Sequence, residues 1–193
     1  MRYLVERRGA ENYAGLPIVA SGPRAALPHS KASHRKVQRG EFVLFDFGAI
    51  VDGYLSDMTR TVVCGEASPK QREVYSLIHR AEEAGVTLIR EGVTGQTVDR
   101  TCRRPLHEGG YGDWTHGYSV GYGLGLEVHE DPFMSEGYLA PLEVGMVVTV
   151  EPGIYIPGWG GVRTEDTVLV TQNGCEVFNT SPRDLLELWR RTQ

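Results

Sequence analysis

Four carboxylates occur at two pairs of positions where they could share bound metal ions. Asp46 directly follows the apolar residues 42–45, and Glu151 directly follows the largely apolar residues 146–150. Acidic residues on strands are usually solvated, so a single one carries no functional interpretation. Both apolar runs, however, are typical of strands buried on both faces, where an unpaired carboxylate is costly. With the second acids, Asp57 and Glu165, the set predicts a divalent cation, because oxygen ligands favour Mn, Mg, Co or Zn.

A hairpin over residues 42–63 must position the first pair. Its centre, residues 52–53, is an Asp-Gly dipeptide, a strong signal for a two-residue turn. With that turn, Asp46 faces Thr59, and Asp57 points to the same face as Asp46. The two aspartates are then diagonal neighbours with Cα atoms roughly 7–8 Å apart. Their carboxylates can converge on metal ions held about 3.5–4 Å apart.

A second hairpin is expected over residues 144–170, with residues 157–161 as its loop. This loop leaves Glu151 and Glu165 on one face of the hairpin, again diagonally offset. Each hairpin thus has an apolar strand that leads to an acid and a return strand with a second acid. The period of this weak repeat exceeds 100 residues, which indicates a duplicated half-domain rather than a solenoid.

Further elements are expected at residues 1–9 (the end of a helix), 16–20 (a short strand), 69–90 and 97–107 (helices) and 182–191 (a short amphipathic helix). Pro105 should end or kink its helix near Arg104. Residues 121–132 are rich in glycine, but no strand-to-helix unit surrounds them, so they are not a dinucleotide-binding motif. Each histidine, His129 and His29 included, is ambiguous taken singly.

Composition narrows the class of protein. The chain has 193 residues, of which 40% are hydrophobic and 23% charged, a balance typical of one globular domain. The net charge of −5 and the absence of a continuous basic face argue against a nucleic-acid partner. The longest apolar runs are strand-sized, so no membrane span is expected. Three dispersed cysteines without a CxxC pair favour free thiols in a reducing cytoplasm.

Three motifs carry a resemblance to a known family, in this order: FDFGAIVDGYLSDMTRT, GLGLEVHEDP and VEPGIYIPGWGGVRTED. They resemble the pita-bread metallopeptidases, namely Xaa-Pro dipeptidase, aminopeptidase P and methionine aminopeptidase, and are nearest the proline-specific members. The similarity runs from about Gly15 to Val170. It implies an α+β, creatinase/aminopeptidase-like fold: a curved, mainly antiparallel sheet with outer helices and a pseudo-twofold repeat. It also implies that residues 1–193 form a single catalytic-type domain without the family's usual N-terminal domain and first helices.

The resemblance implies roles for particular residues. The family binds up to two divalent ions, with Mn expected here and Co, Zn or Mg as alternatives, through two Asp, one His and two Glu. The matching acids are Asp46, Asp57, Glu151 and Glu165. Glu151 would also act as the general base. His129 and His29 match histidines on the substrate side, and Arg163 matches an arginine that pairs with a carboxylate or meets the substrate.

The metal-binding histidine is where the sequence departs from the family. The family places it seven residues before the position of His129, and Tyr122 occupies that position here. A phenol is a poor ligand while it keeps its proton, since its reference pKa is about 10. His116 lies six residues further upstream and stays open as an alternative ligand that a local insertion would recruit.

The expected activity is that of a metal-dependent exopeptidase that hydrolyses short peptides, with Xaa-Pro bonds as the expected substrate, by a metal-activated water. The alternative is a metal-poor or inactive pita-bread homologue that acts as a binding module or as a non-peptide amide hydrolase. Tyr122 favours the alternative, whereas the retained carboxylates and histidines favour the enzyme. A homodimer stays open as an assembly.

Overall fold

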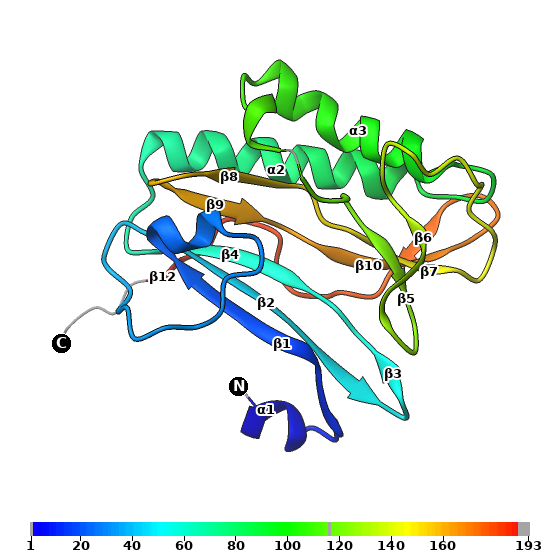
Figure 1. Cartoon of the computed structure of the whole chain (residues 1–193), viewed down its shortest axis with the longest axis horizontal. Helices are drawn as coiled ribbons and strands as arrows, with labels where there is room; N and C mark the ends of the chain where they lie inside the picture. The colour runs from blue at the N-terminus through cyan, green and yellow to red at the C-terminus, as the bar shows by residue number, and fades with distance from the viewer. Residues whose placement is uncertain (1, 116, 189–193) are drawn as a thin grey trace.

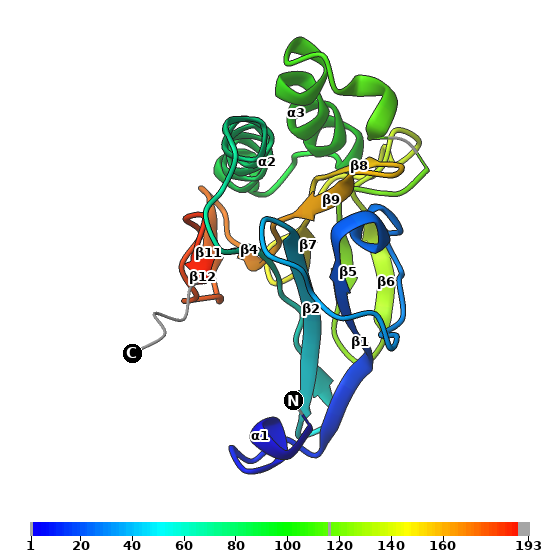
Figure 2. The same ribbon diagram turned by 90° about the vertical axis from the view of Figure 1, so that its left-hand side faces the viewer.

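The computed structural model describes residues 2–115 and 117–188 of the chain. Its strands form two larger sheets and one small sheet, and the two longest helices lie along one side of them (Figures 1 and 2). No helix in this part of the chain is long and apolar enough to cross a membrane.

The first sheet carries the first acidic hairpin. Its order is β1 (Asn12–Ser21), β2 (Phe42–Val51), β4 (Thr59–Cys64) and β12 (Glu187–Leu188), and β3 (Tyr54–Leu55) pairs with the end of β2. Asp46 of β2 faces Thr59 of β4, so the predicted register is confirmed. The turn residues Asp52 and Gly53 both have positive φ, at 51° and 79°, as the two-residue turn requires. β1 begins earlier than residue 16, because residues 12–14 also pair with β2.

The second sheet carries the second pair of acids. Its order is β11 (Cys175–Val177), β10 (Asp166–Val170), β7 (Val147–Val150), β5 (Tyr122–Leu124) and β6 (Val128–Phe133), and β8 (Gly153–Ile156) and β9 (Gly160–Arg163) form the small sheet. The predicted register of this hairpin is wrong by two residues. Ile156 pairs with Gly160, so the loop is residues 157–159. Glu151, between β7 and β8, therefore lies directly opposite Glu165, between β9 and β10. The two residues are not diagonally offset.

The helices are α1 (Arg2–Glu6), α2 (Pro69–Leu88) and α3 (Gly95–Glu108), with short 3₁₀ turns η1 (Gly22–Ala26) and η2 (Gly112–Trp114). Ser68 and Gln71 form a capping box at the start of α2. A Cβ atom on Gly85 would lie 2.4 Å from Cys102 Sγ of α3, so the absent side chain lets the two helices approach. Pro105 was expected to end or kink its helix near Arg104, and it does not end it. The helix runs to Glu108, and its last turn is anchored by the buried Leu106.

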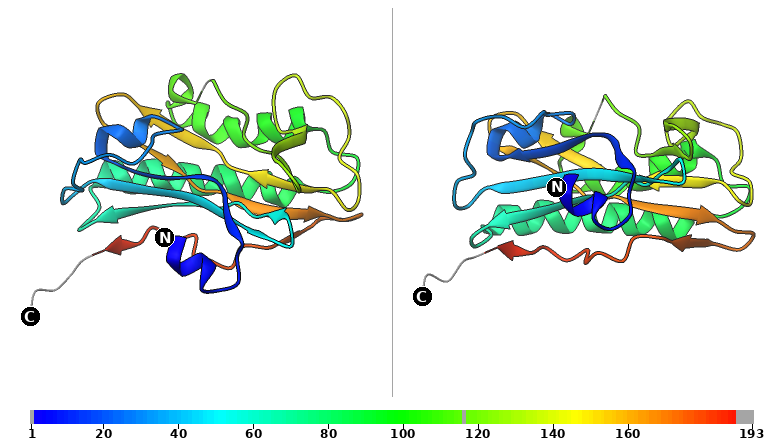
Figure 3. Two further views of the ribbon diagram at one scale, coloured as in Figure 1. Left: turned by 60° about the horizontal axis from the view of Figure 1, so that its bottom comes forward. Right: turned by 90° about the horizontal axis from the view of Figure 1, so that it is seen from below.

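The C-terminal segment is extended, so the predicted helix is wrong for residues 182–188, and the remainder of that prediction lies outside the described residues. β12 pairs in parallel with β4, and Val63 N–H donates to Leu186 O. The edge of β4 that would otherwise be unpaired thus forms hydrogen bonds with backbone groups of the C-terminal segment. In a helix, those groups would have bonded to one another. Figure 3 shows this segment, in red, running along the edge of the molecule from β11 to β12.

The two larger clusters of the hydrophobic core lie between the sheets and the two long helices. One packs α2 against β4, β8 and β9, and includes Val63, Ile78 and Ile154. The other packs α2 and α3 against β7 and β10, and includes Val148 and Val168. The strands on which the acidic residues lie are therefore fixed from the helix side.

Candidate metal centre

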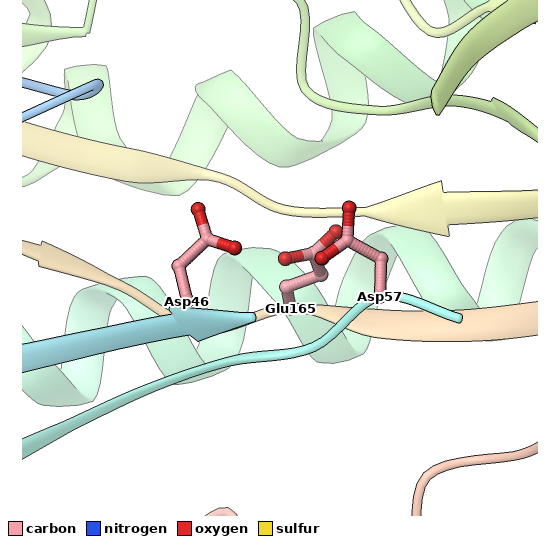
Figure 4. Close-up of side chains that lie close together, drawn as sticks. All are labelled: Asp46, Asp57 and Glu165. Atoms are coloured by element: carbon pink, nitrogen blue, oxygen red, sulfur yellow. The ribbon is translucent and has the colours of Figure 1, made fainter. Parts of the chain in front are cut away.

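Three of the predicted acids converge. Asp46 lies on β2, Asp57 just before β4, and Glu165 just before β10. One carboxylate oxygen of each lies within 4.8 Å of the other two, and Figure 4 shows the three side chains gathered together. Asp57 is 8% exposed and Glu165 is fully buried. Hard oxygen ligands this close together fit a divalent cation.

The hydrogen bonding of the Glu165 carboxylate indicates that a cation fits this site. Its Oε2 accepts a hydrogen bond of 2.6 Å from Thr59 Oγ1. Its Oε1 is buried and has no hydrogen-bond partner among the described residues. A buried carboxylate oxygen without a partner is costly, and a bound cation is a natural partner for it.

Glu151 lines the same cavity as Asp46 and Asp57, but it is not one of the three converging acids. It follows β7, is 8% exposed, and its Oε2 lies 3.5 Å from Arg163 Nε. Arg163 also pairs with Asp46 and donates to Tyr155 Oη at 2.6 Å. A buried guanidinium thus offsets part of the negative charge and holds two of the acidic side chains in place. Of the two contacts expected of Arg163, the structure contains the one with carboxylates.

Burial and the charges of neighbouring acids raise the pKa values of Asp57, Glu151 and Glu165 in the metal-free protein. Burial, followed by the charge of Asp46, raises the pKa of Asp57 to about 6. Burial raises the pKa of Glu151 to about 8, although Arg163 opposes the shift. The pKa of Glu165 is also raised, by burial and then by the charge of Asp57. Like charges held close together and away from water disfavour the ionised form in this way.

Tyr122 faces the carboxylates. It is the first residue of β5, its side chain is buried, and its hydroxyl donates to Asp57 Oδ2 at 2.7 Å. Burial and the charge of Glu165 raise the pKa of the phenol, which keeps its proton. Its ring packs edge-on against His129 with centroids 4.2 Å apart. Its role at the position of a metal ligand stays a prediction.

The candidate site opens into a cavity of about 530 Å³. His129 and His29 both line it, together with Asp46, Asp57 and Glu151. Burial and then the nearby His29 lower the pKa of His129, so its imidazole is neutral at pH 7. His116 lies outside the described residues, so its candidacy as a ligand stays a prediction.

The comparisons with known proteins agree with this geometry. The sequence model of metallopeptidase family M24 matches residues 1–172. The chain belongs to family M24. It is 45% identical to an Xaa-Pro dipeptidase of Pyrococcus furiosus, over 96% of this chain and 53% of that protein. The chain spans about half the length of the curated relatives it matches.

Solved structures also resemble this M24 chain. An Xaa-Pro dipeptidase of Bacillus anthracis is 46% identical, with a TM-score of 0.94, covering 97% of this chain and 52% of that one. An X-Pro aminopeptidase of Thermotoga maritima is 43% identical, with a TM-score of 0.94, covering 97% and 53%. The expected pita-bread fold of class α+β is confirmed.

Some residues of the M24 site were missed by sequence reasoning. Tyr155 accepts from Arg163, and its ring meets Tyr118 edge-on at 5.2 Å. Tyr155 shares the parity of Glu151 along the chain, so strand alternation could have placed both on one face. Tyr118 gave no such signal, because it comes from an irregular segment after η2.

The raised pKa values predict how the metal-free M24 chain responds to pH. Glu151 and the buried Glu82 of α2 both have their pKa raised to about 8, from an ordinary value of 4.5. Over this interval the folded state holds more protons than the unfolded state, so the free energy of unfolding falls as pH rises. The melting temperature of the metal-free protein should therefore drop between pH 5.5 and about 8, and Mn²⁺ should reverse the drop.

Two variants separate the contributions of these groups. Glu151→Gln should flatten the fall and also weaken the effect of Mn²⁺. Glu82→Gln should flatten it without changing that effect, because Glu82 does not line the cavity that Asp46, Asp57 and Glu151 share. A melting temperature that stays level or rises over this range would contradict the assignment.

Proposed function

We propose that this chain carries the catalytic centre of a metal-dependent exopeptidase that hydrolyses the Xaa-Pro bond of short peptides. Membership of family M24 and the names of the relatives, Xaa-Pro dipeptidase and X-Pro aminopeptidase, support this. The observation that carries the proposal is the convergence of Asp46, Asp57 and Glu165, of which Glu165 has a buried Oε1 without a hydrogen-bond partner among the described residues. Mn²⁺ is the proposed metal, and Co, Zn and Mg also suit oxygen ligands.

Asp46, Asp57, Glu151 and Glu165 would together hold up to two cations. When bound, the cation supplies Lewis acidity and lowers the pKa of a water nucleophile. Glu151 would accept a proton from that water, since a carboxylate fixed by Arg163 at the wall of the cavity suits a general base. The neutral His129 would donate a hydrogen bond to the developing oxyanion without adding a cation, and His29 would contact the substrate.

The walls of the cavity support a small, partly apolar substrate. Ile18, Phe47, Val128 and Phe133 line it beside the acids. A proline ring would bury apolar surface against such side chains, while the acids of the same cavity would hold the free amino terminus.

A second function is favoured by one observation. The Tyr122 hydroxyl already satisfies one oxygen of Asp57, which lowers the need for a second cation. The alternative is therefore a metal-poor homologue that binds peptides, or hydrolyses a non-peptide amide, in the same cavity.

A reducing cytoplasm is the proposed compartment. Cys64, Cys102 and Cys175 are all free thiols, which supports this proposal. The proposed partner is a short peptide, and a homodimer is the proposed assembly.

A substrate comparison tests the proposed function. The protein is stripped of metal, loaded with Mn²⁺, and supplied with Ala-Pro, Ala-Ala or N-acetyl-Ala-Pro. Proline should be released from Ala-Pro, the other two should react far more slowly, and a chelator should stop the release. If the protein binds Ala-Pro but hydrolyses it with none of the four metals (Mn, Co, Zn or Mg), the peptidase is rejected in favour of the binding module.

A further inference from the structure

Arg60, the second residue of β4, lies behind the candidate metal centre. Thr59 and Arg60 point to opposite faces of their strand, so Thr59 meets Glu165 and Arg60 points away from the cavity. The residue is 9% exposed, yet all of its nitrogens are used. Nε donates to Pro182 O at 3.1 Å, and Nη2 donates to Asp166 Oδ1 at 2.7 Å and Ser181 O at 3.1 Å.

Its third nitrogen reaches the backbone of the metal centre. Arg60 Nη1 donates to Thr59 O at 2.9 Å and to Glu165 O at 2.5 Å. The same Thr59 O accepts from Glu165 N–H at 3.1 Å. Because Thr59 Oγ1 also donates to Glu165 Oε2, a shift of either backbone would move the Glu165 carboxylate.

The C-terminal segment, residues 179–188, holds the other side of this contact. Arg183 pairs with Asp166, so the buried Asp166 carboxylate lies between two guanidinium groups. Asn179 Nδ2 donates to Asp57 O at 3.3 Å, and its Oδ1 accepts from Thr167 N–H at 2.5 Å. The segment therefore touches the backbone of Asp57 as well as the neighbours of Glu165.

We propose that Arg60 is a positioning residue of the metal centre, which ties the C-terminal segment to the peptide groups that aim Glu165. This rests on the proposed function, because it requires the carboxylates to bind a cation. The planar fork of arginine serves three separate stretches of backbone at once, which the single ammonium of lysine cannot do. The metal affinity of the chain should therefore depend on a side chain that never meets the metal.

The test compares Arg60→Lys with Arg72→Lys. Arg72 pairs with Glu187 and so anchors the same segment, but from an exposed position and without touching Thr59 or Glu165. Mn²⁺ affinity is measured by calorimetry at a temperature where circular dichroism shows every variant folded. Arg60→Lys should weaken the affinity by about 10–100-fold, the usual effect of losing an outer-sphere contact. Arg72→Lys should leave it unchanged.

Hydrogen exchange in the metal-free protein gives a second measurement, independent of the ion. The Glu165 amide, which donates to Thr59 O, should exchange faster in Arg60→Lys and not in Arg72→Lys. If Arg60→Lys does not fold, Asn179→Ala replaces it, and weaker Mn²⁺ binding is again expected. An Arg60→Lys protein, or the Asn179→Ala protein that replaces it, that melts earlier but binds Mn²⁺ as the parent does would overturn the inference. A parent that binds no Mn²⁺ would overturn the proposed function itself and this inference with it.

Discussion

Asp57→Asn is expected to abolish tight binding of divalent metal. Asp57 is one of three acids that each place a carboxylate oxygen within 4.8 Å of the other two, and the resemblance to the family implies that it would serve both ions. Asparagine keeps the size of the side chain but removes the charge and one of the two strong acceptors. The loss should exceed the about 10–100-fold typical of outer-sphere changes, because a direct ligand to both ions is lost.

The loss should not come from unfolding. Asp57 has its pKa raised to about 6 by burial and by Asp46, so its charge destabilises the metal-free protein at pH 7.5. Asp57→Asn should therefore melt no earlier than the metal-free parent. Asp52→Asn makes the same chemical change at an exposed turn residue with φ of 51°, which suits asparagine, and should bind Mn²⁺ normally. Equal Mn²⁺ affinity of Asp57→Asn and the parent in calorimetry would show that the assigned ligand set is wrong.

Tyr122→His is expected to strengthen the metal centre. The Tyr122 phenol keeps its proton and donates a hydrogen bond to Asp57, so it is a poor ligand for a cation. An imidazole coordinates divalent transition metals well at neutral pH. Restoring this ligand should tighten the weaker ion and raise Ala-Pro hydrolysis, each by at least about 10–100-fold.

Tyr122→Phe is the matched control. It removes the hydroxyl from Asp57 but supplies no ligand, so any gain it gives measures only the release of Asp57. Mn²⁺ titration and proline release are followed for the parent and both variants. Equal behaviour of the His and Phe variants would show that residue 122 does not meet the ions. His116 would then be the candidate ligand, and His116→Ala should remove the activity of the parent.

The two hairpins show what local sequence can predict. The first has an Asp-Gly turn whose geometry is encoded by the dipeptide itself, and its register was predicted correctly. In the second, Gly160 and Gly161 resembled loop residues, but they belong to β9. A Cβ atom on Gly161 would lie 2.0 Å from Ala25 O, so this glycine is required by contact with η1. That contact joins residues more than 100 positions apart, and no local pattern records it.

The same limit applies to the C-terminal segment and to Arg60. Residues 182–188 have a helical pattern of leucines, but the free edge of β4 pairs with them as a strand. The partners of Arg60 include backbone oxygens at residues 165, 181 and 182, more than 100 positions away. The four acids could be found because each follows or faces a buried strand, whereas residues that support them from another element could not.

The metal content of the purified protein tests the central claim most directly. The chain is saturated with Mn²⁺ and exchanged into metal-free buffer, and the number of retained ions is measured by native mass spectrometry. Because the carboxylates converge but Tyr122 donates a proton where an imidazole would bind, at most one ion per chain should be retained. Two retained ions would contradict the assigned role of Tyr122. Failure to bind Mn²⁺ even at saturation would contradict the metal centre as a whole.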